Sequence, residues 1–207
     1  MAEAGDNTIT TGEGNDTVTT GDGADMVDAG TGNDVVDTGA GDDTVMAEAG
    51  DNTITTGEGN DTVTTGAGAD QVDAGTGNDT VDTGAGDDVV MAEAGDNTIT
   101  TGEGNDTVTT GDGNDVVDGG AGDDTLRSTA GTNTLRGGAG NDTISGGTGN
   151  DTIIGGTGDD QILSDIGDDL VDAGTGNDTV DTGAGDDTVL AESGDNTITT
   201  GEGNDTV

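Results

Sequence analysis

Residues 119–127 read GGAGDDTLR, and the same pattern returns at 137–145 as GGAGNDTIS and at 146–154 as GGTGNDTII. Outward from these stretches, a period of nine residues continues without an insertion from Ala2 to Val207. The chain therefore holds 22 complete nine-residue units and eight residues of a twenty-third. An unbroken repeat of this kind is typical of a solenoid, in which each unit packs only on its neighbours.

Three positions of the unit are constant or nearly so. Position 4 is Gly in all 23 units, position 8 is Ile, Val or Leu in all 23, and position 6 is Asp in 18 units and Asn in five. Position 2 is Gly in 17 units. Glycines at positions 2 and 4 favour a turn with positive φ, and positions 7 to 9 favour a three-residue strand with its middle side chain inward. Two units then make one flattened coil of 18 residues. The fixed period argues against a flexible Gly-rich linker, because a linker needs no fixed spacing of its glycines.

The units that begin at residues 119, 137 and 146 match the nonapeptide G-G-x-G-x-D-x-U-x, and over its whole length the chain resembles calcium-binding repeats-in-toxin (RTX) proteins. The resemblance implies an all-β fold, a right-handed parallel β-roll (a β-helix, or solenoid) with two nonapeptides in each coil. We expect residues 2–207 to form a single continuous domain of 23 units without caps.

The composition excludes most other classes of protein. The chain has 46 acidic and 2 basic residues, a formal net charge of -44, and no aromatic residue, Pro, Cys or His. Such a surface repels nucleic acid and anionic membrane, and no run of about 18 apolar residues is present to span a bilayer. One aliphatic side chain per unit is too small a core to fold the chain alone, so a further source of folding energy is required. A metal cation is the obvious counter-charge.

Calcium suits this turn because it takes six to eight oxygen ligands, and a Gly-rich turn that ends in Asp offers backbone carbonyls and a carboxylate together. Units two apart in sequence lie above one another, so Asp16 is expected to stack on Asp34. The two stacks leave 21 gaps between turns, and 21 calcium ions would carry +42 against -44. Magnesium dehydrates too reluctantly, and zinc lacks its His and Cys ligands.

The expected site residues follow from the repeat. Calcium-binding aspartates at position 6 are Asp16, Asp25, Asp34, Asp43, Asp61, Asp70, Asp79, Asp88, Asp106, Asp115, Asp124, Asp142, Asp151, Asp160, Asp169, Asp178, Asp187 and Asp205. Weaker or different metal positions are Asn7, Asn52, Asn97 and Asn196. Turn glycines expected to contribute backbone carbonyls are Gly12, Gly14, Gly30, Gly32, Gly57, Gly59, Gly102, Gly104, Gly120, Gly122, Gly138 and Gly140.

Two kinds of unit depart from the pattern. Four units, beginning at residues 2, 47, 92 and 191, carry Glu at position 2 and Asn at position 6. Either their sites bind calcium differently, or the Glu decorates a slightly different turn. The unit STAGTNTLR at 128–136 has no carboxylate and is the expected metal-poor layer. Its Arg136 either offsets the charge of Asp118 in the coil below or is a solvated cation.

Catalysis is not expected, since there is no His, Cys, Lys or Tyr and the carboxylates repeat identically along a convex rod. Ice binding is one alternative, because outward pairs such as Thr8/Thr10 and Thr17/Thr19 resemble threonine arrays, although Asp and Met interrupt them. The repeat domain of a secreted RTX toxin or enzyme is another.

The favoured hypothesis is a calcium-stiffened structural rod, secreted or at the cell surface, in a fibre, surface layer or adhesin. Neither end is capped in the sequence, and Met1 matches Met46 and Met91 in phase. Either chains join end to end in register, or the sequence is a segment of a longer array of the same units. Outward Ile154, Leu170 and Leu190 offer lateral contact. The resemblance also implies secretion into millimolar calcium, where loose calcium sites fill.

Overall fold

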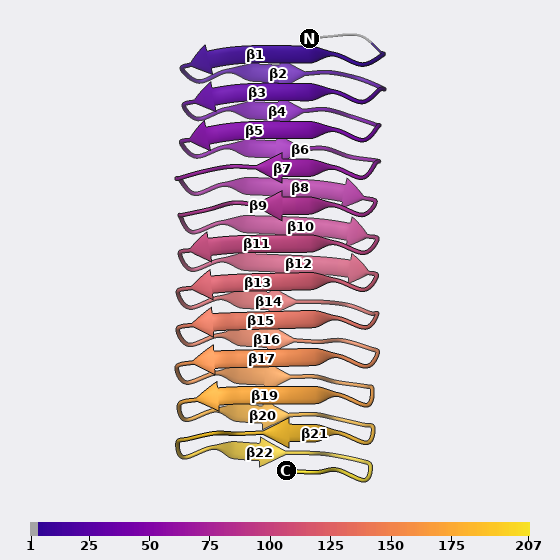
Figure 1. Cartoon of the computed structure of the whole chain (residues 1–207), viewed down its shortest axis with the longest axis vertical. Helices are drawn as coiled ribbons and strands as arrows, with labels where there is room; N and C mark the ends of the chain where they lie inside the picture. The colour runs from indigo at the N-terminus through magenta and orange to yellow at the C-terminus, as the bar shows by residue number, and fades with distance from the viewer. Residues whose placement is uncertain (1–3) are drawn as a thin grey trace.

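In the computed structural model the chain is described over residues 4–207, and this part forms a stack of about 11 coils without a helix (Figure 1). Its strands make two parallel sheets of 11 strands each, one from the odd-numbered and one from the even-numbered strands. None of the described residues belongs to a helix able to cross a bilayer. The strands are β1 (Thr8–Glu13), β2 (Thr17–Thr19), β3 (Met26–Thr31), β4 (Val35–Asp37), β5 (Thr44–Ala49), β6 (Thr53–Thr55), β7 (Thr62–Thr64), β8 (Gln71–Thr76), β9 (Thr80–Asp82), β10 (Val89–Ala94), β11 (Thr98–Glu103), β12 (Thr107–Asp112), β13 (Val116–Ala121), β14 (Thr125–Arg127), β15 (Thr134–Ala139), β16 (Thr143–Ser145), β17 (Thr152–Thr157), β18 (Gln161–Leu163), β19 (Leu170–Thr175), β20 (Thr179–Asp181), β21 (Thr188–Leu190) and β22 (Thr197–Thr199).

The register of the sheets confirms the coil of two nonapeptides. Each strand pairs with the strand two places along the chain, so that Ile9 of β1 lies beside Val27 of β3 and Val18 of β2 beside Val36 of β4. Paired residues are therefore 18 apart throughout the regular strands. Identical positions of alternate units meet in every coil, and any side chain that faces the gap between coils is repeated along the rod.

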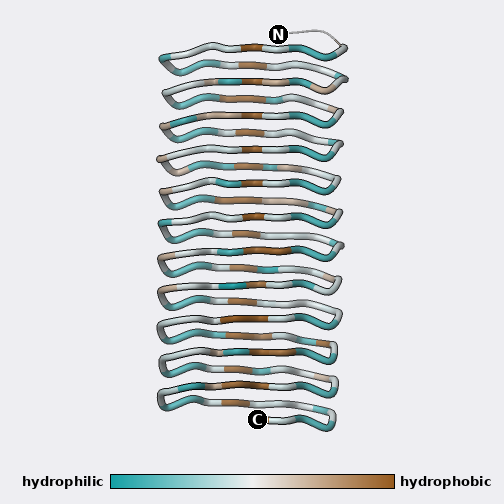
Figure 2. The backbone as a smooth tube through the Cα atoms, viewed as in Figure 1, coloured by the Kyte–Doolittle hydropathy of each residue, from teal (hydrophilic) through white to brown (hydrophobic). Residues whose placement is uncertain are grey.

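The core is a single column of aliphatic side chains between the two sheets. Position 8 is buried from Val18 to Val189, and Figure 2 shows this column as a brown band along the middle of the stack. Alanines at position 1, such as Ala29 and Ala173, add to it. At the last coil Ile198 is only partly buried and Val207 is 74% exposed, because no further coil covers them.

Half of the strands are longer than the predicted three residues. In β1 and β3 the pairing continues from the strand into the turn, through Gly12 beside Gly30 and Glu13 beside Thr31. Turns without a continuous strand still pair at position 3, as Ala40 does with Glu58. The ladder therefore follows the chain around the bend, because stacked turns of identical shape keep their backbone groups opposite one another.

The turn glycines are required both by their φ angles and by the close approach of coils. Gly158 has φ +128°, and a Cβ there would lie 1.9 Å from the carbonyl oxygen of Gly140 in the preceding coil. All the turn glycines named from the sequence have positive φ. Two of the Glu-containing turns differ, since the strand register shifts where Ala47 pairs with Gly30 and where Ala92 pairs with Gly75. Gly66, stacked on Glu48, then lies outside the left-handed region, so the altered turn shape passes to the next coil. Glu3 of the first such unit lies outside the described residues.

A matched pair of substitutions separates φ strain from coil contact. Gly14 has φ +117°, but an added Cβ would have no atom within 4 Å, because Gly14 lies in the first coil. Gly158 packs against Gly140 of the preceding coil. Gly14→Ala is expected to cost about 1–2 kcal/mol from backbone strain alone. Gly158→Ala adds a steric overlap with backbone, so its thermal midpoint in calcium should fall at least twice as far. Equal shifts in differential scanning calorimetry would contradict the close-contact argument.

Candidate metal centres

Position 6 supplies two internal columns of carboxylates, one along each edge of the coil. The side chains point inward because Oδ1 accepts the backbone N–H of position 6 in the preceding coil. Asp16 N donates to Asp34 Oδ1 at 2.8 Å, and Asp25 N donates to Asp43 Oδ1 at 2.8 Å. Asp34 and Asp43 are each 1% exposed. Stacking thus holds successive carboxylates directly above one another, away from water.

The second carboxylate oxygen, Oδ2, has no hydrogen-bond partner although it is buried. A buried acceptor or charge without a partner costs several kcal/mol, so these atoms mark positions where a donor or a cation is needed. The aspartates with such an Oδ2 are Asp16, Asp25, Asp34, Asp43, Asp61, Asp70, Asp79, Asp88, Asp106, Asp115, Asp124, Asp142, Asp151, Asp160, Asp169, Asp178 and Asp187.

Other oxygens point to the same gaps. The position 4 carbonyl faces the next coil, since a Cβ on Gly32 would lie 2.1 Å from the carbonyl oxygen of Gly14. Position 1 also borders Oδ2, because a Cβ on Gly155 would lie 2.5 Å from Asp160 Oδ2 and 2.6 Å from the carbonyl of Ala173 in the next coil. A gap between two aspartate units therefore gathers two carboxylates from adjacent coils and main-chain carbonyls at positions 1 and 4.

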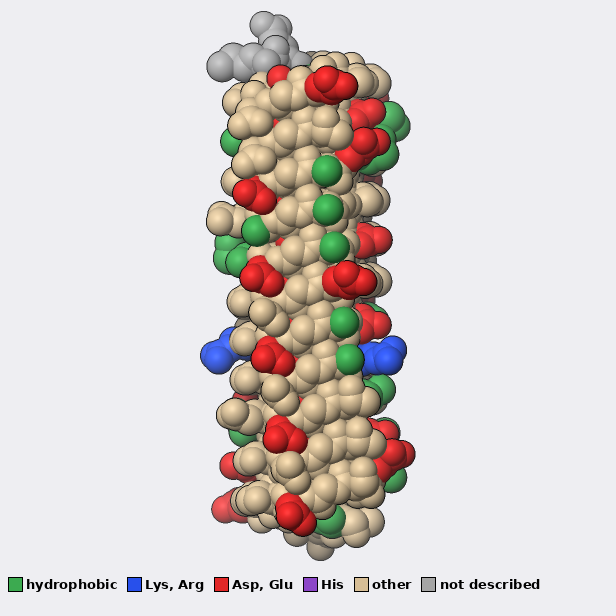
Figure 3. All heavy atoms as spheres, turned by 90° about the vertical axis from the view of Figure 1, so that its left-hand side faces the viewer, with side chains coloured by type: hydrophobic (Ala, Val, Ile, Leu, Met, Phe, Trp, Pro, Cys, Tyr) green, Lys and Arg blue, Asp and Glu red, His purple; other side chains and the backbone are tan. Residues whose placement is uncertain are grey.

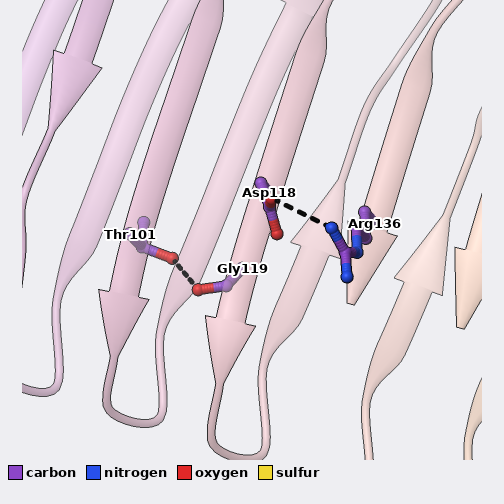
Figure 4. A network of polar contacts seen from close by, with 4 residues as sticks. All are labelled: Thr101, Asp118, Gly119 and Arg136. Carbon is purple, nitrogen blue, oxygen red and sulfur yellow. Dashed lines mark hydrogen bonds and ion pairs between the residues drawn. The ribbon is translucent and has the colours of Figure 1, made fainter. Parts of the chain in front are cut away.

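The residue at position 1 varies the surroundings of the carboxylate. Where it is Thr, its hydroxyl in most units donates to the position 1 carbonyl of the next coil, as Thr101 Oγ1 does to Gly119 O at 2.9 Å (Figure 4). Thr110 is an exception, since its buried hydroxyl has no partner. Where it is Gly, as in the unit that begins at Gly119, no hydroxyl takes that carbonyl. The units that begin with Gly keep the full G-G-x-G-x-D pattern.

Burial raises the pKa of many of the stacked carboxyls in the middle of the rod. For Asp124 the pKa rises to about 7, chiefly through loss of hydration and also through repulsion from Asp106 and Asp142, against the backbone hydrogen bond from Asp106. Burial likewise raises the pKa of Asp79 and Asp160 to about 6, again partly offset by a backbone hydrogen bond. These buried carboxyls thus resist ionisation unless a positive charge compensates them, whereas near the first coil burial is outweighed by hydrogen bonds from Thr20 and Asn7, which lower the pKa of Asp25.

The donor set fits calcium. Its atoms are carboxylate and carbonyl oxygens, which hard divalent cations prefer, and the residues contain no nitrogen or sulfur ligand for zinc. Among residues 4–207, no group of three or more Asp, Glu, His or Cys side chains converges on one point. An ion between two turns therefore takes part of its ligand shell from the main chain, which explains why the turns need glycine as well as aspartate.

The predicted site residues occupy these gaps with differences at the ends and at the Asn units. Asp16 and Asp205 are only partly buried, because they lie in or near the terminal coils. Asn52 and Asn97 are fully buried in the same columns as the aspartates, while Asn7 and Asn196 are partly buried. Whether each position binds an ion stays a prediction.

The unit at 128–136 stacks in the same columns as its neighbours, and its poverty in metal stays a prediction. Asn133 is 1% exposed, and its Oδ1 accepts the N–H of Asp115 at 2.9 Å, as an aspartate would. Arg136 of β15 lies beside Asp118 of β13, with 3.7 Å between Nη1 and Oδ2 (Figure 4). The ion-pair alternative for Arg136 is thus the one observed. Both side chains are exposed, so the pair contributes about 0–1 kcal/mol.

Sequence reasoning missed a second, outer ladder at position 5. Here the bonds run the other way along the rod: Asn141 N donates to Asp123 Oδ1 at 2.7 Å, and Asp159 N donates to Asn141 Oδ1 at 2.8 Å. On this edge Asp and Asn alternate from Asp87 to Asp195, and Figure 3 shows the resulting evenly spaced column of carboxylates. Alternation keeps neighbouring surface charges two coils apart. The Asp/Asn preference at position 5 was the available signal.

The sequence was compared with known families and proteins. A profile described as RTX calcium-binding nonapeptide repeat (4 copies) matches at residues 1–36, 37–72, 64–99, 91–126, 127–162, 145–180, 163–198 and 172–207, which together span the whole chain. No curated protein matches the chain.

Proposed function

Because the chain belongs to the RTX calcium-binding nonapeptide repeat family, we propose that it is a calcium-folded structural rod that works outside the cell. Family membership implies calcium binding and a β-roll. The observation that carries the rod proposal is the regular stack itself, in which 17 aspartates along two edges each turn a buried, unpartnered carboxylate oxygen toward a gap between coils. Millimolar extracellular calcium fills sites of moderate affinity, whereas cytosolic calcium leaves them empty.

A structural role is supported over a catalytic one by the repetition of the surface. Enzyme sites need a cleft with differently tuned groups, and this chain repeats the same turn along both edges. Ice binding is not favoured, because paired threonines are interrupted: Thr64 of β7 lies between Met46 and Asp82 on the adjacent strands. The rod is therefore proposed as a spacer or fibre element.

End-to-end association is part of this proposal. Residues 200–207, TGEGNDTV, followed by another copy of MAEAGD would reproduce the order found inside the chain around Met46. The exposed Val207 and the partly buried Ile198 would then gain a covering coil. Lateral contact has weaker support, since Ile154 and Leu190 of the odd sheet are separated by Asp172.

The test is electron microscopy and small-angle X-ray scattering of the 207-residue chain in calcium. A single chain should be a rod about 55 Å long, at about 4.8 Å per coil, and fibres should repeat at about the same distance. Val207→Asp is expected to abolish fibres while leaving calcium-induced β structure intact. Thr109→Asp, which adds the same charge on a sheet face between Met91 and Arg127, should leave fibres unchanged.

Each result has a definite meaning for the proposal. Rods without fibres would support a spacer and contradict end-to-end assembly. Fibres with an unrelated axial repeat would contradict the in-register junction. A compact particle of another shape in calcium would contradict the rod itself.

A further inference from the structure

The Asn residues of position 6 differ from the aspartates in one atom, and that atom decides what fills the gap above them. In both residues Oδ1 accepts the N–H of the preceding coil: Asp34 N donates to Asn52 Oδ1 at 3.0 Å, and Asp79 N donates to Asn97 Oδ1 at 3.0 Å. The other branch is Oδ2 in Asp and Nδ2 in Asn. An acceptor without a partner is thus replaced by a donor at the same place.

The amide uses both of its hydrogens on oxygens of the gap. Asn52 Nδ2 donates to Gly50 O of its own turn at 2.8 Å and to Asp70 Oδ1 of the next coil at 2.9 Å. Asn97 Nδ2 makes the same two bonds, to Gly95 O at 3.0 Å and Asp115 Oδ1 at 3.0 Å.

The first coil repeats the arrangement, and the carboxylate-free layer has a variant of it. Asn7 Nδ2 donates to Gly5 O and, at 3.0 Å, to Asp25 Oδ1. Asn133 Nδ2 donates instead to the position 1 carbonyl of the next coil, Gly146 O, at 3.3 Å. In all four gaps the Asn Nδ2 thus donates to a main-chain carbonyl oxygen of the gap. In the aspartate units an unpartnered Oδ2 occupies the place of this Nδ2.

We infer that Asn7, Asn52, Asn97 and Asn133 are metal-free clamps, whose side-chain amides take the place of a calcium ion between stacked turns. A cation in the same gap would meet a hydrogen-bond donor and only one carboxylate. The 21 gaps then divide into 17 with an unpartnered aspartate Oδ2 and four closed by an amide. The chain therefore takes about 17 ions rather than 21, and in the folded rod the amide layers join neighbouring coils without an ion of their own.

This inference deepens the proposed function, because it rests on calcium binding in the aspartate gaps and states which gaps bind none. It replaces the expectation that Asn7, Asn52 and Asn97 are weaker calcium positions. Asn196 is not included, since it lies in the last turn of its edge and has no coil above it.

Native mass spectrometry of the calcium-loaded chain counts the bound ions one by one. The triple variant N7D/N52D/N97D replaces each amide nitrogen by an oxygen and is expected to bind three more ions than the wild type. N15D is the matched control. It makes the same amide-to-carboxylate change at position 5, where Asn15 is exposed and its Oδ1 accepts the N–H of Asn33. It should leave the count unchanged.

A reverse substitution keeps the inference testable if the triple variant does not fold. Asp61→Asn places an amide in a gap that has an unpartnered Oδ2, so it should bind one ion fewer and keep its calcium-induced β structure. Asp42→Asn, at an exposed position that accepts the N–H of Asn60, is its control. Gains and losses of this size support the clamps. An unchanged count in both variants overturns them, and a wild type that binds no calcium at all overturns the calcium sites as well.

Discussion

In EDTA at pH 7.5 the chain is expected to lose its β structure completely and to regain it when calcium is added in excess. Seventeen aspartates have one buried carboxylate oxygen without a partner, and each uncompensated buried charge costs several kcal/mol. Together these costs exceed the roughly 5–15 kcal/mol of stability typical of a folded domain. The net charge of -44 adds repulsion along the whole rod.

Far-UV circular dichroism during a calcium titration measures this transition. Because stacked gaps share coils, folding in one gap prepares the next, so the titration should be steeper than independent binding. Magnesium at equal concentration is the control, and it should fail because it keeps its hydration water. A β-sheet spectrum that persists in EDTA would show that the amide clamps and the aliphatic column suffice without metal.

The coil was predictable because the sequence repeats at one fixed period. Val27 must stack on Ile9 once two units make a turn, and the register follows for every later coil. The inward position of Asp34 was also predictable in outline, since stacked units place equivalent residues over one another. A repeat protein needs only its local unit to specify its long-range contacts.

Other features depend on the relation between one turn and the next, which a single unit does not contain. The sequence does not show that positions 5 and 6 bond in opposite directions. At position 6, Asp34 Oδ1 accepts a hydrogen bond from the preceding coil, whereas at position 5, Asp123 Oδ1 accepts one from the following coil. The sequence also does not show that Gly66, which stacks on Glu48 of the preceding coil, lies outside the left-handed region. The same change occurs at Gly111, which stacks on Glu93. It does not pass further, since Gly84, which stacks on Gly66, again has φ +90°. A Glu at position 2 thus acts on the backbone of the one coil that follows it.

Acid is expected to replace calcium in part. Without metal, burial raises the pKa of Asp124 to about 7 and of Asp88 and Asp151 to about 6, from an ordinary value of 3.8. A raised pKa in the folded chain means that the coil binds protons more tightly than the unfolded chain does. The stabilisation is therefore fully present below about pH 3.8 and is lost as the pH rises through about 6 to 7.

Two measurements follow from this sign. In EDTA the β signal should be strong near pH 4 and should disappear as the pH rises through 6 to 7. In calcium, the half-saturating concentration should increase as the pH falls from 8 to 5, because protons and calcium compete for the same oxygens. Sodium chloride at 1 M and pH 7.5 is the control: it screens exposed charges but does not reach buried carboxylates, so it should restore little β structure. An EDTA spectrum that does not change between pH 4 and 7.5 would mean that the buried carboxylates do not limit folding.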